Sequence, residues 1–170
     1  PVAPVGARDL PLQIRSTSVP FKLDDKQADR IGRLRWRGGI AMTANARNFG
    51  GWSDLHIAAD GRSLSSISDE GSWLIATIET DKDGNLSGLG DARIGSLRGL
   101  DGQPIQDKMM GDAEGLSAMP DNSWLVSFER EHRLWRYPTL DGVPTALNLP
   151  DDFGRQPKNG GVEALLVLGD

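Results

Sequence analysis

The stretch Glu114-Gly115-Leu116-Ser117-Ala118, which runs on to Asp121-Asn122, decides the fold because the chain contains this pattern three times. The first copy is Ser53-Asp54-Leu55-His56-Ile57 with Asp60-Gly61 after it, and the third is Glu163-Ala164-Leu165-Leu166-Val167 with Gly169-Asp170 after it. Leu55, Leu116 and Leu165 hold equivalent places, so the copies begin 61 and 49 residues apart. Repeats of this spacing, each a short apolar run followed by a turn, are typical of propeller blades. The sequence therefore predicts an all-β protein with a β-propeller fold.

Turn residues between apolar runs divide the chain into blades of four antiparallel strands. We expect strands at 53–58, 63–68, 73–79 and 86–94, then at 114–119, 123–128, 133–137 and 145–149, and a last one at 162–168. The chain 1–170 is then a single propeller domain, or a fragment of one, with about two to three blades. Its parts are a leading segment with the first strands (1–50), a blade (51–97), a loop (98–111), a blade (112–150) and the start of the next blade (151–170). Because a propeller closes with typically about 4 to 8 blades, we expect the missing blades to come from another chain or a longer parent protein.

Composition narrows the classes of function. A chain of 170 residues with 38% hydrophobic and 25% charged residues can form one folded domain with a core. Its net charge of −5 argues against a nucleic acid partner, which needs a basic face. No segment approaches the roughly 18 apolar residues of a membrane span. The chain has no cysteine, so a metal would be held by oxygen ligands or by His56 and His132.

Acidic residues recur at one place in the repeat, which predicts a site. The innermost strands of successive blades meet around the central axis, so Glu114 and Glu163 should lie close together there, with Ser53 from the first copy. Carboxylates that share one channel repel each other unless a cation or a proton neutralises them, and Ca²⁺ prefers about six to eight oxygen ligands. We therefore expect a Ca²⁺ site. Its candidate ligands are Glu114, Glu163, Glu70, Asp69 and, through a carbonyl oxygen, Asn159; the alternative is that the acidic turn residues are only solvated and that Asn159-Gly160 is only a turn.

Two neighbouring residues are candidates for catalysis. Glu129 ends the hairpin equivalent to that of Asp69 and Glu70, and Arg130 follows it. A guanidinium there could bind a phosphate through its planar fork, or could pair with Glu129 or Glu114. His132 could carry a proton near neutral pH, or could simply belong to the hairpin turn. No Gly-x-Ser-x-Gly elbow is present in the sequence, so a serine esterase is not supported.

Several longer strings resemble one known family. They are Ser68-Asp69-Glu70-Gly71, Gly111-Asp112-Ala113-Glu114-Gly115-Leu116, Trp124-Leu125-Val126-Ser127-Phe128-Glu129-Arg130, His132-Arg133-Leu134-Trp135-Arg136-Tyr137 and Asn159-Gly160-Gly161-Val162-Glu163-Ala164-Leu165. Together they make the chain similar, over about residues 50–169, to the bacterial proteins described as having esterase-like activity of phytase. The resemblance implies a propeller fold, hydrolysis of phosphate or carboxylate esters, and a periplasmic or extracellular location.

These observations leave three functions open. The first is a metal-assisted hydrolase that acts on a small anionic ester, with Glu129 and Arg130 at the reacting group. The second is a propeller that binds a protein or glycan and whose acidic ring is only structural. The third is a lactonase-type propeller with the same kind of carboxylate and asparagine metal site. Separately, Trp73, Trp124 and Trp135 lie within expected strands, so we expect them in the core between blades.

Overall fold

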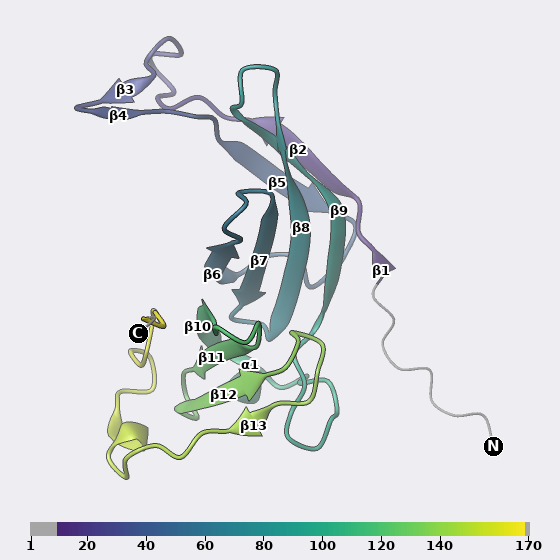
Figure 1. The fold of residues 1–170 in the computed structure, drawn as a ribbon, viewed down its shortest axis with the longest axis vertical. Coiled ribbons are helices and arrows are strands. Elements are labelled where there is room, and N and C mark those ends of the chain that lie inside the picture. Colours follow the sequence, from purple (N-terminus) through teal and green to yellow (C-terminus); the bar gives the residue numbers. More distant parts are fainter. Residues whose placement is uncertain (1–9, 169–170) are drawn as a thin grey trace, which may run out of the picture.

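The computed structural model describes residues 10–168 and is built almost entirely of antiparallel strands (Figure 1). The larger sheet has the order β1-β9-β8-β7-β6. Its strands are β6 (Trp52–Ile57), β7 (Ser63–Ser68), β8 (Ser72–Thr80), β9 (Leu86–Ser96) and the short β1 (Leu10–Pro11) on the outer edge. The second sheet has the order β10-β11-β12-β13, with β10 (Ala113–Ala118), β11 (Trp124–Phe128), β12 (Arg133–Tyr137) and β13 (Thr145–Ala146).

Each of these sheets contains four strands that are consecutive in the chain and antiparallel, which is the structure of a propeller blade. The all-β, partial-propeller prediction is therefore confirmed, since the two sheets do not close into a ring. The sequence predicted the position of each of these eight strands to within a few residues. Where boundaries differ most, the reason is local: β13 pairs with β12 only at Thr145 and Ala146, so it is shorter than expected.

Two smaller two-stranded sheets and two short helices complete the described part. β2 (Ile14–Ser18) pairs with β5 (Ile40–Ala44), and β3 (Arg30–Ile31) pairs with β4 (Leu34–Arg35). The predicted loop at 98–111 contains the isolated bridge from Arg98 to Pro104 and ends in α1 (Lys108–Gly111). A 3₁₀ turn, η1, spans Phe153–Arg155. Among residues 10–168 no helix is long and apolar enough to cross a membrane.

Side chains on the two faces of the first blade enter two different cores, because neighbouring residues of a strand point to opposite sides. On β8, Trp73 and Ile75 face the second blade, whereas Leu74 and Ala76 face the β2–β5 sheet. The core between the blades is built from Ile67, Trp73, Leu97, Ala113, Leu116, Val126, Phe128, Trp135, Tyr137 and Leu140, with Trp124 packed at its margin. The structure thus places Trp73, Trp124 and Trp135 in or against this core, as predicted.

The inner strands of the two blades are also joined directly. β10 packs against β6 and β7. The backbone N–H of Leu116 on β10 donates to Oδ2 of Asp54 on β6 at 2.8 Å. This contact sets the first residues of the two repeats side by side, and it is these residues that carry the candidate site.

The strand predicted at 162–168 does not form in the described residues. A strand needs a backbone ladder with a neighbour, and here the segment is held by hydroxyl groups instead. Ser127 Oγ donates to the carbonyl of Val162 at 2.6 Å, and the N–H of Val167 donates to Ser117 Oγ at 3.0 Å. The segment therefore lies beside the second blade without pairing with it. The first nine residues of the predicted leading segment and Gly169-Asp170 of the third repeat lie outside the described residues.

Candidate functional site

The repeat has a matching irregularity at the start of both inner strands. The pairing of β6 with β7 shifts register between Trp52 and Asp54, and the pairing of β10 with β11 shifts between Ala113 and Gly115. Ser53 and Glu114 are thus the extra residues of two equivalent β-bulges. A bulge turns a side chain away from the regular alternation and is frequent beside functional sites. The orientation of the Glu114 side chain is therefore set by a β-bulge that is present in both blades.

Backbone hydrogen bonds define which other residues correspond. The N–H of Asp69 donates to the carbonyl of Gly51 at 2.9 Å, and the N–H of Glu129 donates to the carbonyl of Asp112 at 2.8 Å. The first blade therefore has Gly51, Ser53 and Asp69 where the second has Asp112, Glu114 and Glu129. Only one of the three positions is acidic in the first blade and all three are acidic in the second, so the acidic cluster is a property of the second repeat.

The cluster itself consists of Asp112, Glu114 and Glu129, which offer carboxylate oxygens that all lie within 4.8 Å of one another. Asp112 and Glu129 are only 4% and 6% exposed, and Glu114 is partly buried. Three carboxylates at this separation repel each other strongly when they are shielded from water. The arrangement is stable only with positive charge or protons beside it.

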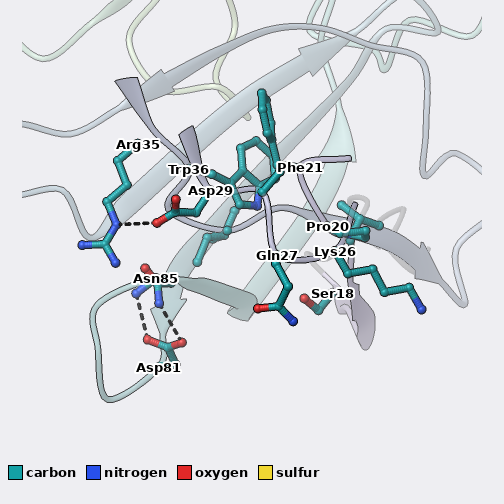
Figure 2. Close-up of a pocket in the computed structure, with 14 residues that line it drawn as sticks. Ser18, Pro20, Phe21, Lys26, Gln27, Asp29, Arg35, Trp36, Asp81 and Asn85 are labelled. Atoms are coloured by element: carbon teal, nitrogen blue, oxygen red, sulfur yellow. Dashed lines mark hydrogen bonds and ion pairs between the residues drawn. The ribbon is translucent and has the colours of Figure 1, made fainter. Parts of the chain in front are cut away.

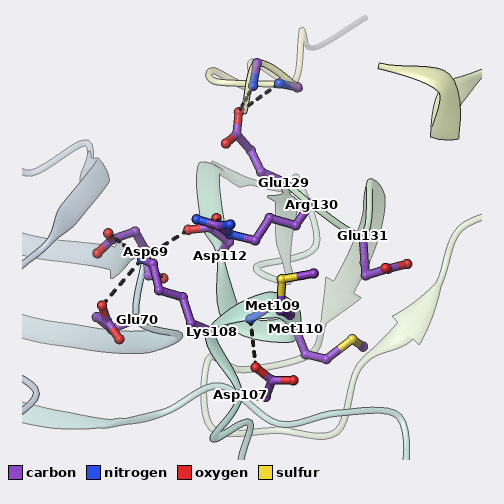
Figure 3. A network of polar contacts seen from close by, with 12 residues as sticks. Asp69, Glu70, Asp107, Lys108, Met109, Met110, Asp112, Glu129, Arg130 and Glu131 are labelled. Carbon is purple, nitrogen blue, oxygen red and sulfur yellow. Dashed lines mark hydrogen bonds and ion pairs between the residues drawn. The ribbon is translucent and has the colours of Figure 1, made fainter. Parts of the chain in front are cut away.

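Two basic side chains supply part of that charge (Figure 3). Arg130 Nε forms an ion pair with Asp112 Oδ2. Lys108 Nζ lies 3.4 Å from the other oxygen of Asp112, 2.8 Å from Asp69 Oδ2 and 3.4 Å from Glu70 Oε1. The hydrogen bond to Asp69 raises the pKa of Lys108, so this amine stays charged. Lys108 therefore links the turn of the first blade to the cluster of the second.

Glu129 is held by backbone amides as well as by its neighbours. Its Oε1 accepts hydrogen bonds from the N–H groups of Gly160 and Gly161 at 2.5 and 2.8 Å (Figure 3). Burial opposes ionisation, but the amide of Gly161, a hydrogen bond with Glu163 and the amide of Gly160 together lower the pKa of Glu129. The same hydrogen bond raises the pKa of Glu163. The pair therefore holds a shared proton most readily on Glu163, beside an ionised Glu129.

Glu114 is the member of the cluster whose negative charge is least compensated by its neighbours. Burial raises its pKa, the hydroxyl of Ser53 opposes this with a hydrogen bond, and the charges of Asp112, Glu129 and Glu163 raise it further. Six carboxylates, those of Asp69, Glu70, Asp112, Glu114, Glu129 and Glu163, thus surround two cations, Lys108 and Arg130. The excess of negative charge and the all-oxygen donor set fit a hard divalent cation such as Ca²⁺.

The structure gathers most of the residues that the sequence singled out. Glu114, Glu129, Glu163 and Arg130 meet around Asp112, and Asp69 and Glu70 form a second group joined to them by Lys108. Asn159 is exposed, and among residues 10–168 no hydrogen bond joins its side chain to the cluster. It is instead the two glycines after it that bind Glu129. His132 lies in the β11–β12 turn with Nε2 3.1 Å from the carbonyl oxygen of Gln156.

Sequence reasoning missed two members, Asp112 and Lys108. Asp112 had a usable signal, because it stands two residues before Glu114 at the start of a strand, where side chains two apart share a face. Lys108 had none. It reaches the acidic residues because the loop closes with α1, whose N-cap Asp107 accepts a hydrogen bond from the N–H of Met109 at 3.0 Å. A single short turn of helix at the end of an irregular loop leaves no periodic pattern in the sequence.

Fold and site together define a propeller-blade protein with a carboxylate cluster at the start of an inner strand. Residues 47–170 match the Phytase-like family model, described as esterase-like activity of phytase. Since the match covers most of the chain, the protein belongs to this family. Comparison with curated proteins and with solved structures found no match.

Proposed function

We propose that the cluster of Asp112, Glu114 and Glu129 binds Ca²⁺ and that the protein is a metal-assisted hydrolase of phosphate or carboxylate esters. The observation that carries the proposal is the approach of three shielded carboxylates to within 4.8 Å with two cations against six acids around them. The family description supports the reaction class. Asp69 and Glu70, which Lys108 connects to Asp112, stay proposed ligands, and Asn159 stays a proposed carbonyl ligand.

In the proposed reaction, the ion and the side chains of the protein have different roles. Bound calcium would supply a Lewis acid that polarises a phosphoryl or carbonyl oxygen toward attack by water. Arg130 uses its Nε on Asp112, which leaves its remaining N–H groups to bind an anionic substrate. The proton held between Glu129 and Glu163 lies next to the cluster, where it could be given to the departing alcohol. Binding of the anionic substrate and proton transfer thus fall to residues of the second blade and the segment after it, whereas Asp69 and Glu70 belong to the first blade.

The test compares hydrolysis of p-nitrophenyl phosphate and p-nitrophenyl acetate by protein that has been stripped with a chelator and then reloaded with Ca²⁺. We expect activity to return with the ion and to fall about 100-fold or more in Glu114→Gln, because a ligand is lost. Glu131→Gln is the matched control. It makes the same chemical change on the same hairpin, and the Glu131 side chain is exposed and directed away from Asp112 (Figure 3).

Activity that is equal in stripped, reloaded and Glu114→Gln protein would contradict the proposal. If chelation changed neither hydrolysis nor stability, a binding or scaffold propeller would be the better account. Hydrolysis of a γ-lactone in place of both esters would favour the lactonase-type alternative.

Two further parts of the proposal concern the location of the protein and the source of the remaining blades. The family resemblance supports a periplasmic or extracellular location, which fractionation of the producing cells would test. The two described blades support the idea that further blades come from a longer parent protein or a second chain, and the native mass of the protein on an immunoblot under denaturing and non-denaturing conditions would separate the two.

A further inference from the structure

A cavity lies far from the acidic cluster. It has a volume of about 670 Å³ and lies between the β8–β9 turn and an arm, residues 19–38, that carries the β3–β4 hairpin (Figure 2). The turn with Asp69 and Glu70 is at the opposite end of β8, a strand of 9 residues. At about 3.3 Å per residue the two places are roughly 30 Å apart, so the cavity is not part of the metal cluster.

The walls of the cavity are fixed by contacts between the arm and the hairpin. Arg37 Nη2 donates to the carbonyls of Asp83 and Gly84 at 2.8 and 3.1 Å, and the N–H of Leu86 donates to the carbonyl of Arg37 at 2.7 Å. Gly38 has φ +98°, and a Cβ there would lie 2.6 Å from the carbonyl oxygen of Leu86. Only glycine allows the arm to approach the backbone of Leu86 this closely. Gly38 therefore lets the arm pack against the β8–β9 hairpin.

Two aromatic rings line the cavity. Phe21 and Trp36 have ring centroids 5.5 Å apart at an interplanar angle of 40°, and Trp36 is 37% exposed (Figure 2). The Trp36 ring packs directly on the backbone of Gly39, where an added Cβ would lie 2.4 Å from a ring carbon. The indole is therefore held in place while more than a third of the residue stays accessible to a ligand.

The charged residues of the cavity are balanced in sign, and two of them form an ion pair. Arg35 Nε binds Asp29 Oδ2 at 3.2 Å, and Asp81 accepts hydrogen bonds from the backbone and side chain of Asn85. With Lys26 the cavity has two cations against two anions. The side chains of Ser18 and Gln27 also line it, and the described residues give neither a hydrogen-bond partner. The Ser18 hydroxyl, the Gln27 amide and the Lys26 ammonium, which also has no partner among the described residues, are thus the polar groups left for a ligand, and all three can hydrogen-bond to a hydroxyl group.

We propose that this cavity binds a neutral carbohydrate, a short oligosaccharide. The C–H face of a sugar ring carries partial positive charge and suits the negative face of an indole. Sugar hydroxyls both donate and accept hydrogen bonds, which matches the Gln27 amide and the Ser18 hydroxyl. The volume falls within the range of about 300–1,000 Å³ that ligand sites occupy. The equal numbers of cations and anions in the lining give the cavity no net charge that would attract an ionic ligand.

The experiment titrates the full chain with cellohexaose, maltohexaose and chitohexaose (acetylated), by calorimetry and by tryptophan fluorescence. We expect at least one of them to bind with a Kd of about 1 mM or tighter. Trp36→Ala should weaken binding about tenfold, and Gln27→Ala about threefold. Leu34→Ala should change nothing, because Leu34 is 71% exposed on the same arm outside the cavity. Salt should also have no effect on the Kd, since no net charge is involved.

The proposal is overturned if none of the three sugars binds at up to about 20 mM, a limit set by the weakest affinity expected of such a site. It is equally overturned if Trp36→Ala and Gln27→Ala both bind these sugars like the wild type. Should Trp36→Ala fail to fold, Gln27→Ala decides alone, because Gln27 is exposed and its side chain has no hydrogen-bond partner among the described residues.

Discussion

Glu114 is the residue on which both the charge balance and the proposed chemistry depend. Its carboxylate sits at a β-bulge, hydrogen-bonded to Ser53 and faced by Asp112, Glu129 and Glu163. Burial and these neighbours raise its pKa. The folded protein therefore binds the proton of Glu114 more tightly than the unfolded chain does. Ionised Glu114 consequently weakens the metal-free fold, and the effect grows as pH rises through the carboxyl range.

We expect Glu114→Gln to raise the Tm of the metal-free protein at pH 7, because the amide keeps the shape and removes the unpaired charge. The difference should disappear at about pH 3, below the ordinary carboxyl pKa, where Glu114 is protonated in both folded and unfolded states. Thermal unfolding in chelator at both pH values measures this. Glu131→Gln should show no such pH-dependent gain, and a Glu114→Gln protein less stable than wild type at pH 7 would disprove the charge account.

The inner strand β10 is the element that joins the blades. It faces β6, and one of its amides, that of Leu116, is bound by Asp54 Oδ2 at 2.8 Å, while Asp54 Oδ1 accepts from the N–H of Leu55 at 2.7 Å. An N–H left without a partner at a partly buried contact is unfavourable by about 1–3 kcal/mol. Asp54 therefore contributes to the docking of one blade on the other as well as to the irregular start of its own strand.

Asp54→Ala should lower the free energy of unfolding by about 1–3 kcal/mol, since it strips both amides of their acceptor. Urea denaturation followed by tryptophan fluorescence would measure the change. Asp60→Ala is the matched control: Asp60 is exposed and, among the residues that the structure describes, its carboxylate accepts a hydrogen bond only from the nearby N–H of Arg62, so we expect a smaller loss. Equal losses for the two variants would mean that the contact between blades contributes nothing specific.

At the scale of elements the sequence was most informative where strands pair with their chain neighbours. Apolar runs between strong turn residues located β6 to β9 and β10 to β13, because each of these strands needs only the adjacent hairpin to form its ladder. The same pattern at 162–168 gave no strand, since a strand also needs a partner and the hydroxyls of Ser117 and Ser127 hold this segment instead. Repeat position predicted Glu114 and Glu163 in the site, but not Lys108, which arrives from an irregular loop.

In the molecule as a whole, the two candidate sites lie at opposite ends of β8. The acidic cluster lies at the end where the β7–β8 turn meets α1 and β10, and the aromatic cavity lies at the β8–β9 turn (Figure 1). A net charge of −5 is consistent with the excess of carboxylates at the first of these ends. Cation binding there would favour the folded state, since the unfolded chain does not bring Asp112, Glu114 and Glu129 together.

The account rests on that cation, and a calorimetric titration of chelator-stripped protein with Ca²⁺ tests it most directly, with Glu114→Gln and Glu131→Gln titrated alongside. We predict that the wild type and Glu131→Gln each bind about one ion per chain, and that Glu114→Gln does not bind while remaining folded. A wild type that binds no calcium, or a Glu114→Gln variant that binds it with unchanged affinity, would contradict the assignment of this cluster as the metal site.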